Sequence, residues 1–413
     1  MSRRFIMPEE AHTIIKEHFT ATPVGVEKIL VTEAYGRVLA EDVVSRLDVP
    51  SFSRSKVDGY AVSSADTFGA EEHQPVTLKV LGHISAGSYP RLKVKRGAAA
   101  GIATGAPIPT GADAVVMVEF TSREGNMVKI YRPVAPNANI LERGFDIKAG
   151  ETILKFQQLS ASDLGVLSAI GLKEVKVFKK PKVAVISTGD EVVEPSKPLP
   201  SAKVYDVNRS TIAASVSICG CKPIIFGIVR DDPAALKHNL KKALTKAEVV
   251  ITSGATSVGV EDYMPKILNE LGKPGVIVGG LATKPGKPTN VAVVNGKPVF
   301  ALPGHPASGL IVFNLLVRPV LCKMAGLPAE VSEPKVLAKA AARIFPEKGR
   351  RTYMTVRLER GLNGELLAHP IPAESGAITT LAKADGFIEI PETREFIEKD
   401  EKVVVHLLRA KSF

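Results

Sequence analysis

The chain has 413 residues, too many for one hydrophobic core of ordinary size, and its 45% hydrophobic content predicts roughly two to four domains. No run of about 18 uninterrupted apolar residues occurs and the first residues lack an apolar leader, so we expect neither a membrane span nor a secretory signal. Three cysteines are too few for a disulfide framework, which favours buried thiols in a reducing cytoplasm.

The net charge of +11 suggests that the protein binds anionic partners. A solvated basic surface, a phosphorylated small molecule and nucleic acid are the three interpretations. The chain has no RGG tract, zinc-finger spacing or RNP-like aromatic motif, so we expect no nucleic-acid partner.

Residues 1–180 form the first region. The segment PEEAHTIIKEHF has apolar residues at helical spacing. SASDLGVLSAIG predicts a second helix capped by Ser160 or Ser162, with Gly171 just past its end. Between them lie strand-like runs with Gly and Pro turns. We expect a small β-rich domain, at about residues 47–145, inserted between helical pieces.

Residues 181–327 form the second region, where apolar strands alternate with helices from KVAVIST onward. This alternation predicts a parallel sheet covered by helices on both faces, a three-layer α/β domain. Asn295-Gly296 predicts a hairpin turn within it, and PASGLIVFNLLVRPVLCKMAG predicts a long closing helix. In residues 328–413, short strands between turns predict a small β-barrel or sandwich.

Polar residues cluster after the strands of the second region. GDE follows KVAVIST, RDD follows KPIIFGIV, SGATSVGVEDY ends the EVVIT strand, KPGKP follows GVIVGGLA, and LPGH ends the last strand. Ligands bind beyond the carboxyl ends of strands in such sheets. Glycines at 254 and 259 permit positive φ and a close backbone approach, so this loop can hold an anion with its N–H groups.

Carboxylates beside a phosphate site repel the ligand unless a divalent cation bridges them, as Mg²⁺ does with one or two carboxylates plus substrate phosphates. Each residue also has a plain structural interpretation. Asp262 and either Asp231 or Asp232 are natural helix caps, and Lys284 and Lys287 are turn residues between prolines.

Eight motifs in order carry a resemblance to a known family: SFSRSKVDGYAV, TGAPIPTGADAVV, RGFDIKAG, STGDEVVE, YDVN, SGATSVGVEDY, KPGKP and LPGHPAS. They cover nearly the whole chain and resemble the MoeA family of molybdenum-cofactor biosynthesis, which includes the gephyrin E domain.

The resemblance implies a multi-domain α/β plus β chain. Its expected parts are a helical linker domain with a β-rich insertion, a MogA-like molybdopterin-binding α/β domain, and a C-terminal β-barrel. It implies insertion of molybdate into adenylylated molybdopterin with release of AMP, with Mg²⁺ or a similar divalent cation. It further implies a cytoplasmic homodimer, with other proteins of cofactor biosynthesis as candidate partners.

Matching motif by motif assigns the site residues. The expected catalytic residues are Asp58, Thr104, Asp146, Glu191, Asp231 and Asp262, of which Glu191, Asp231 and Asp262 are the expected metal ligands. The expected substrate-binding residues are Gly254, Ser257, Gly259, Lys284, Lys287, Pro303 and Gly304.

Three positions depart from the family pattern. Ala255 stands where members commonly have a second glycine, Gly280 where many carry a basic residue, and His305 where many bacterial members have Asn. Tungstate insertion, molybdopterin adenylylation and a gephyrin-type scaffold are the alternative functions. The N-terminal motifs and the C-terminal strands argue against the adenylyltransferase, which consists of the α/β domain alone.

Overall fold

The structure is a computed structural model that describes residues 5–254, 263–327, 335–371 and 378–408. The chain divides into two compact units. The first comprises Met1–Lys28, Gly36–Ala40 and Lys176–Phe413, and the second comprises Ile29–Tyr35 and Glu41–Val175. Each unit has hydrophobic clusters of its own, so each is described by itself.

A six-stranded sheet forms the centre of the first unit. Its order is β16 (Lys222–Val229), β13 (Lys182–Thr188), β17 (Val249–Ser253), β21 (Lys297–Leu302), β20 (Asn290–Val294) and β18 (Pro274–Gly279). β16, β13, β17 and β21 are parallel, whereas β20 is antiparallel to β21 and to β18. β18 therefore runs in the same direction as β21.

The sheet is thus parallel, as predicted, except at β20. The predicted Asn295-Gly296 turn is confirmed and is the reason: both residues have positive φ, 50° and 80°, which closes a tight hairpin between β20 and β21. Five of the six strands still end at one edge, so the reversal of β20 leaves the loops of interest together.

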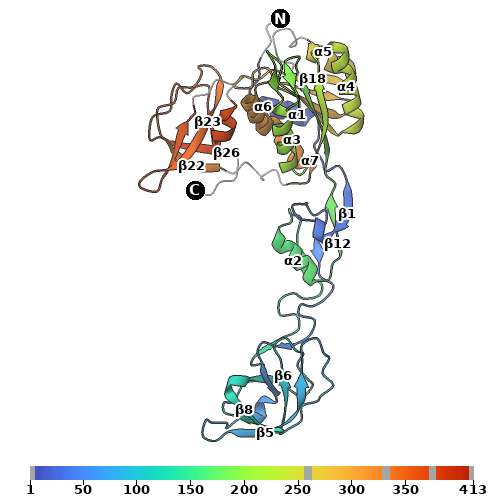
Figure 1. Cartoon of the computed structure of the whole chain (residues 1–413), viewed down its shortest axis with the longest axis vertical. Helices are drawn as coiled ribbons and strands as arrows, with labels where there is room; N and C mark the ends of the chain where they lie inside the picture. Colours follow the sequence, from blue (N-terminus) through green and yellow to red (C-terminus); the bar gives the residue numbers. More distant parts are fainter. Residues whose placement is uncertain (1–4, 255–262, 328–334, 372–377, 409–413) are drawn as a thin grey trace. The chain divides into compact units, whose positions relative to one another are not determined.

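Helices cover both faces of this sheet, as predicted (Figure 1). α4 (Pro233–Lys246) and α5 (Tyr263–Leu271) pack on one face, and α1 (Pro8–His18), α3 (Asn208–Ile218), α6 (Pro306–Val312) and α7 (Arg318–Met324) pack on the other. Alternate residues of β13 point to opposite layers: Val183 and Val185 join the α1 side, and Ala184 and Ile186 join the α4 side.

Two helices differ from expectation in their setting. α1 forms where predicted, but its buried face, with Ala11 and Ile15, packs into the α/β core. The long closing helix contains a π-helical segment, Phe313–Val317, between α6 and α7. Pro319 follows this segment, and because proline has no N–H to donate, the regular hydrogen-bond ladder is interrupted there.

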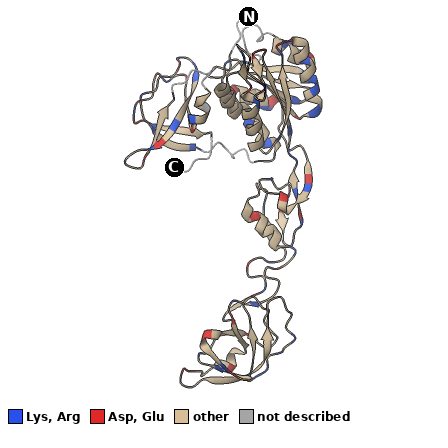
Figure 2. Ribbon diagram, in the orientation of Figure 1, with Lys and Arg blue, Asp and Glu red and all other residues tan. Residues whose placement is uncertain are grey.

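The continuous helical run Pro306–Met324 is long and apolar enough to cross a membrane by composition, and 67% of its apolar window is buried inside the protein. Its burial against the sheet is that of a core helix. The basic residues of α4 lie on its outer face, and Figure 2 shows Lys and Arg along this helix. Part of the positive charge is therefore a solvated surface.

The C-terminal strands close into a five-stranded barrel. The order is β23 (Arg351–Arg360), β24 (Leu366–Pro370), β22 (Lys335–Ala340), β26 (Lys402–Leu407) and β25 (Gly386–Ile390), and β25 pairs back with β23. A sixth strand, β19 (Thr283–Lys284), comes from the α/β region and pairs in parallel with β23. The barrel sheet is thus continuous with the segment that carries Lys284.

The second unit is β-rich, as predicted. Its six-stranded sheet has the order β7 (Ala114–Met117), β4 (Gly59–Val62), β6 (Ala98–Ile102), β5 (Val76–Ile84), β9 (Met127–Ile130) and β8 (Thr121–Glu124). All of β6 is buried, and its small residues Ala99 and Ala100 face separate apolar clusters. Of the two predicted caps of α2 (Ala161–Ala169), Ser160 is the one used, and it forms a capping box in which Ser160 and Asp163 bond reciprocally.

Short elements complete the described chain. They are β1 (Val26–Leu30) with β12 (Glu174–Phe178), β2 (Val43–Val44) with β11 (Thr152–Leu154), β3 (Arg54–Ser55) with β10 (Ile140–Leu141), β14 (Val192–Val193) with β15 (Val204–Tyr205), the 3₁₀ turns Val31–Glu33, Ser64–Thr67 and Val118–Phe120, and α8 (Thr379–Lys383).

Candidate functional site

Three carboxylates gather where β13 and β16 end. Asp190 and Glu191 follow β13, and Asp231 follows β16, which is the direct neighbour of β13. The backbone N–H of Asp231 donates to Oδ1 of Asp190 over 3.4 Å. Burial and the charges of Glu191 and Asp190 raise the pKa of the Asp231 carboxyl. Because these like charges repel one another at a half-buried position, a bound cation would stabilise the three carboxylates.

Asp232 resolves the choice between the two neighbouring acids. Its Oδ2 accepts from the backbone N–H of Ala235 at 2.7 Å and so caps α4. Within the described parts of the chain, Asp231 makes no such bond, and its buried Oδ1 has no hydrogen-bond partner. The structural role falls on Asp232, which leaves the Asp231 carboxylate available to a ligand.

The middle of the edge, at β17, is lined by small polar groups. The hydroxyls of Ser187 and Ser253 lie at paired positions on β13 and β17 and are buried. Neither has a hydrogen-bond partner among the residues that the structure describes. Gly254 follows with a φ of 103°, and a Cβ there would lie 2.2 Å from the carbonyl oxygen of Thr188. Only glycine fits this close approach, as its sequence context predicts.

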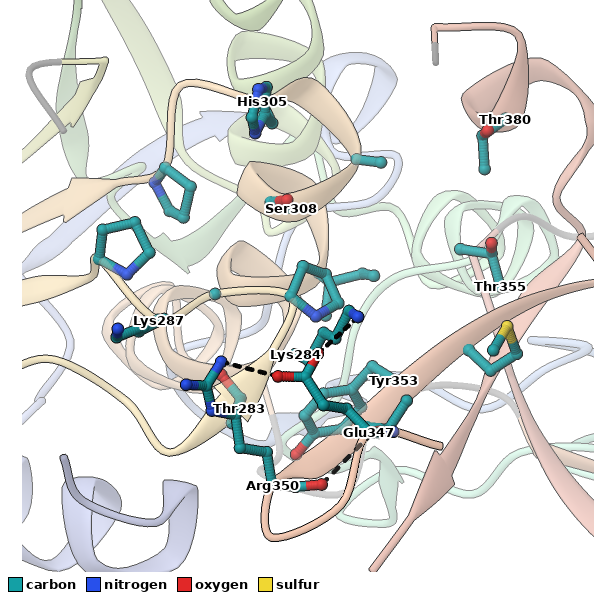
Figure 3. A pocket seen from close by; sticks show the side chains of 18 of the residues that line it. Thr283, Lys284, Lys287, His305, Ser308, Glu347, Arg350, Tyr353, Thr355 and Thr380 are labelled. Carbon is teal, nitrogen blue, oxygen red and sulfur yellow. Dashed lines mark hydrogen bonds and ion pairs between the residues drawn. The ribbon is translucent and has the colours of Figure 1, made fainter. Parts of the chain in front are cut away.

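The other half of the edge opens into a cavity of about 930 Å³ (Figure 3). This volume suits a small-molecule ligand. The sequence-predicted residues that line it are Lys284, Lys287, Pro303 and Gly304, together with His305. The barrel supplies residues that the sequence reasoning missed: Phe345, Glu347, Arg350, Thr352, Tyr353, Met354, Thr355, Ile371 and Thr380. The pairing that brings the barrel here, β19 with β23, is two residues long and has no pattern to predict it.

A compact charge cluster lies in this cavity. Lys284 Nζ is 2.5 Å from Oε2 of Glu347, and Arg350 Nη1 is 3.0 Å from its Oε1 (Figure 3). The hydrogen bond from Lys284 and its positive charge, with those of Arg350 and Lys287, hold the pKa of Glu347 below its usual range. One carboxylate thus sits among three cations at the edge of a ligand-sized space.

The LPGHP turn is fixed from a neighbouring helix. Asn208, the first residue of α3, donates its side-chain amide to the carbonyl oxygen of Gly304 at 2.6 Å. The carbonyl of His305 accepts from Gly309 N–H at 2.9 Å in the first turn of α6. The YDVN and LPGHP motifs, almost 100 residues apart, therefore share one structural junction.

The Phe5 ring lies beside Gly280, the position where many family members carry a basic residue. Gly280 has a φ of 112°, and a Cβ there would lie 2.7 Å from the Phe5 ring. The same ring lies under the ammonium of Lys287, 4.7 Å from the ring centroid to Nζ. The aromatic ring of the N-terminal segment therefore occupies the space of a side chain at 280 and supports Lys287 by a cation–π contact.

The remaining predicted residues divide between the second unit and the part outside the described residues. In the second unit Asp58 and Thr104 meet, since Asp58 Oδ1 accepts from Thr104 N–H at 2.8 Å. Asp146 is exposed in the same unit, and its backbone N–H donates to Val49. The assignments of Ser257, Gly259 and Asp262 lie outside the described residues.

Asp190, Glu191 and Asp231, which we call the acid corner, offer part of a cation site. Among the described residues, no group of three or more His, Cys, Asp or Glu is arranged to hold a metal ion. Glu191 and Asp231 nevertheless suit a hard cation that takes most ligands from water and substrate, since Asp231 has an unpartnered buried oxygen and a raised pKa. This donor set, all oxygen, is the one Mg²⁺ prefers.

Comparison with known proteins covers most of the chain. The MoeA N-terminal region (domain I and II) matches residues 6–171, a probable molybdopterin binding domain matches residues 184–323, and the MoeA C-terminal region (domain IV) matches residues 337–408.

Individual relatives agree with these matches. A molybdopterin molybdenumtransferase of Nostoc sp. is 36% identical over 378 residues, covering 90% of this chain and 86% of that protein. One from Haemophilus influenzae is 33% identical and covers 94% and 96%. The crystal structure of a molybdopterin biosynthesis MoeA protein from Pyrococcus horikoshii is 40% identical, covers 99% of this chain and all of that one, and superposes with a TM-score of 0.87. With the expected domains present in order and relatives aligned along nearly the full length, this chain belongs to the MoeA family.

Proposed function

We propose that this protein is a molybdopterin molybdenumtransferase, which inserts molybdate into adenylylated molybdopterin and releases AMP. The observation that carries the proposal is the cation-lined cavity at the carboxyl edge of the α/β domain, with Lys284, Lys287 and Arg350 around it. Molybdate is a tetrahedral dianion, and lysine and arginine side chains bind such ions through charge-assisted hydrogen bonds. The hydroxyl of Ser308 also lines this cavity and can donate to an oxyanion.

The acid corner suits the other end of the substrate. Glu191 and Asp231 would hold Mg²⁺ together with phosphate oxygens of the adenylyl group, and the cation would supply charge neutralisation as AMP leaves. The chain's own task there is to place these carboxylates. The buried hydroxyls of Ser187 and Ser253 are further donors, and neither is bonded to another described residue. No protein nucleophile is required, because the dithiolene sulfurs that capture molybdenum are carried by the substrate.

The direct experiment is to measure AMP release from adenylylated molybdopterin with and without molybdate, with Mg²⁺ or with EDTA. We expect AMP release to require both molybdate and Mg²⁺. A parallel reaction with tungstate tests the alternative oxyanion, since the two ions have nearly the same size and charge. Release that does not respond to either oxyanion would contradict the proposal.

Asp58 and Thr104 lie in the second unit, whereas Glu191 and Asp231 lie in the first. We further propose a cytoplasmic homodimer in which these two sets come from different subunits. Mixing an Asp58→Asn variant with a Glu191→Gln variant tests this. If sites are shared, random heterodimers regain one intact site of two, which restores roughly a quarter of wild-type turnover. A mixture as inactive as its parts would argue for sites built within single chains.

A further inference from the structure

The cluster of Lys284, Glu347 and Arg350 contains an anion supplied by the protein itself. Each oxygen of the Glu347 carboxylate takes one cation, Oε2 with Lys284 at 2.5 Å and Oε1 with Arg350 at 3.0 Å. Figure 3 shows the three side chains converging between the β19 segment and the barrel. The geometry is that of a doubly bound carboxylate at a place suited to an oxyanion.

Glu347 is held in this position by its own backbone. Its N–H donates to the Thr352 hydroxyl at 3.2 Å, and its carbonyl accepts from Arg350 N–H at 3.4 Å. Thr352 is in turn paired with Lys284 across β23 and β19. The loop before β23 therefore delivers the carboxylate to the lysine in a defined register, so the contact is built into the junction between barrel and α/β domain.

The cluster is open to exchange. The side chains of Lys284, Arg350 and Glu347 are 59%, 38% and 34% exposed, respectively. Ion pairs with this exposure are weak and screened, so a stronger anion can replace one partner at little cost. A dianion has twice the charge of the carboxylate and presents four oxygens to the cations.

We propose that Glu347 is an internal competitor for the oxyanion in this cavity. In the free protein its carboxylate neutralises Lys284, and a bound oxyanion displaces it. This inference rests on the proposed function, since it takes the cavity as the molybdate site.

The test is to measure binding of molybdate and of perrhenate, a tetrahedral monoanion, to the full chain by titration calorimetry at low ionic strength. In Glu347→Gln we expect molybdate to bind about tenfold more tightly, the effect of removing one charge about 6 Å from a dianion in water. The affinity for perrhenate should rise only about threefold, because perrhenate carries half the charge of molybdate. Both gains should shrink in high salt.

Glu270→Gln is the matched control. Glu270 pairs with Lys237 at 2.6 Å on α4 and α5, is 58% exposed, and does not line the cavity. We expect it to change neither affinity. Molybdate binding that is unchanged or weaker in Glu347→Gln, with wild-type binding intact, would overturn the role of Glu347 alone. Absence of molybdate binding to the wild type would overturn it together with the proposed function.

Discussion

At the carboxyl edge of one sheet, the loops after β13 and β16 present carboxylates, whereas the loops after β18 and β21 present lysines and proline-held turns. The acid half has a residue with a raised pKa, Asp231, and the basic half has one with a lowered pKa, Glu347. Burial and the neighbouring carboxylates raise the pKa of Asp231, whereas the hydrogen bond from Lys284 and the surrounding cations lower the pKa of Glu347. The strand order separates the charges, since β16 and β13 lie at one side and β18 at the other.

This separation of charges suits a reaction with two anionic groups that need different surroundings. A phosphoanhydride bridged by a cation needs carboxylates, and a free oxyanion needs ammonium and guanidinium groups. If the two were mixed, the lysines would pair with the acids and neither ligand would be bound well. Glu347 is a carboxylate among the cations of the basic half, and it comes from the C-terminal barrel, not from the α/β sheet.

The seam between the halves, at β17, is where a substitution should have the largest effect. Gly254→Val places a β-branched side chain at a φ of 103° and against the Thr188 carbonyl, 2.2 Å from the new Cβ. We expect a loss of about 3 kcal/mol in stability, seen as a lower melting temperature. The control is Gly279→Val on β18, where a Cβ meets nothing within 4 Å. Equal melting temperatures in the two variants would contradict this account of Gly254.

The basic half can be tested with Lys284→Ala. Losing one charge-assisted hydrogen bond should weaken molybdate binding by about 2 kcal/mol, or roughly thirtyfold, in calorimetric titration. Lys237→Ala, which removes an exposed lysine of α4 outside the cavity, is the control and should bind molybdate normally. The comparison between halves fails if Glu191→Gln weakens molybdate binding as much as Lys284→Ala does.

The acid half can be tested with Asp231→Asn. We expect AMP release to slow by more than about tenfold, at least about 1.4 kcal/mol in the barrier. The same variant should melt slightly higher, by about 1 °C near neutral pH, because the folded protein disfavours the charged carboxylate.

The sign of this stability effect follows from the raised pKa of Asp231. The folded pKa lies above the ordinary value of 3.8, so the stabilisation by the protonated form is present below that value and is lost as pH rises through the folded pKa. The melting temperature of Asp231→Asn should therefore exceed that of the wild type by an increasing amount as pH rises from about 4 toward neutrality. A difference that narrows over this range would argue against like-charge repulsion at Asp231.

The smallest effect is expected at the neighbouring residue. Asp232→Ala removes the cap of α4 and should lower stability by about 1 kcal/mol while AMP release stays at the wild-type rate. Thermal melts and turnover assays on Asp231→Asn and Asp232→Ala side by side separate a ligand-facing acid from a cap. If both variants lost turnover equally, the division of roles between the two acids would be wrong.

The sequence by itself determined the local elements and much of the site's composition. Apolar alternation placed the strands, Ser160 and Gly171 bounded α2, and Asn295-Gly296 specified a hairpin, because these preferences depend on neighbouring residues only. The motifs also identified Lys284, Lys287, Pro303 and Gly304, which the structure brings to one cavity.

Only the tertiary structure decided the relations between distant segments. It joined α1 to the α/β core and paired β19 with β23, which brought Glu347 and Arg350 to Lys284. It also showed that Asp232 is the cap, since the choice between two adjacent acids depends on backbone direction at the helix start. Long-range pairing of short segments has no periodic pattern in the sequence, because its free energy comes from burial and register in the completed fold.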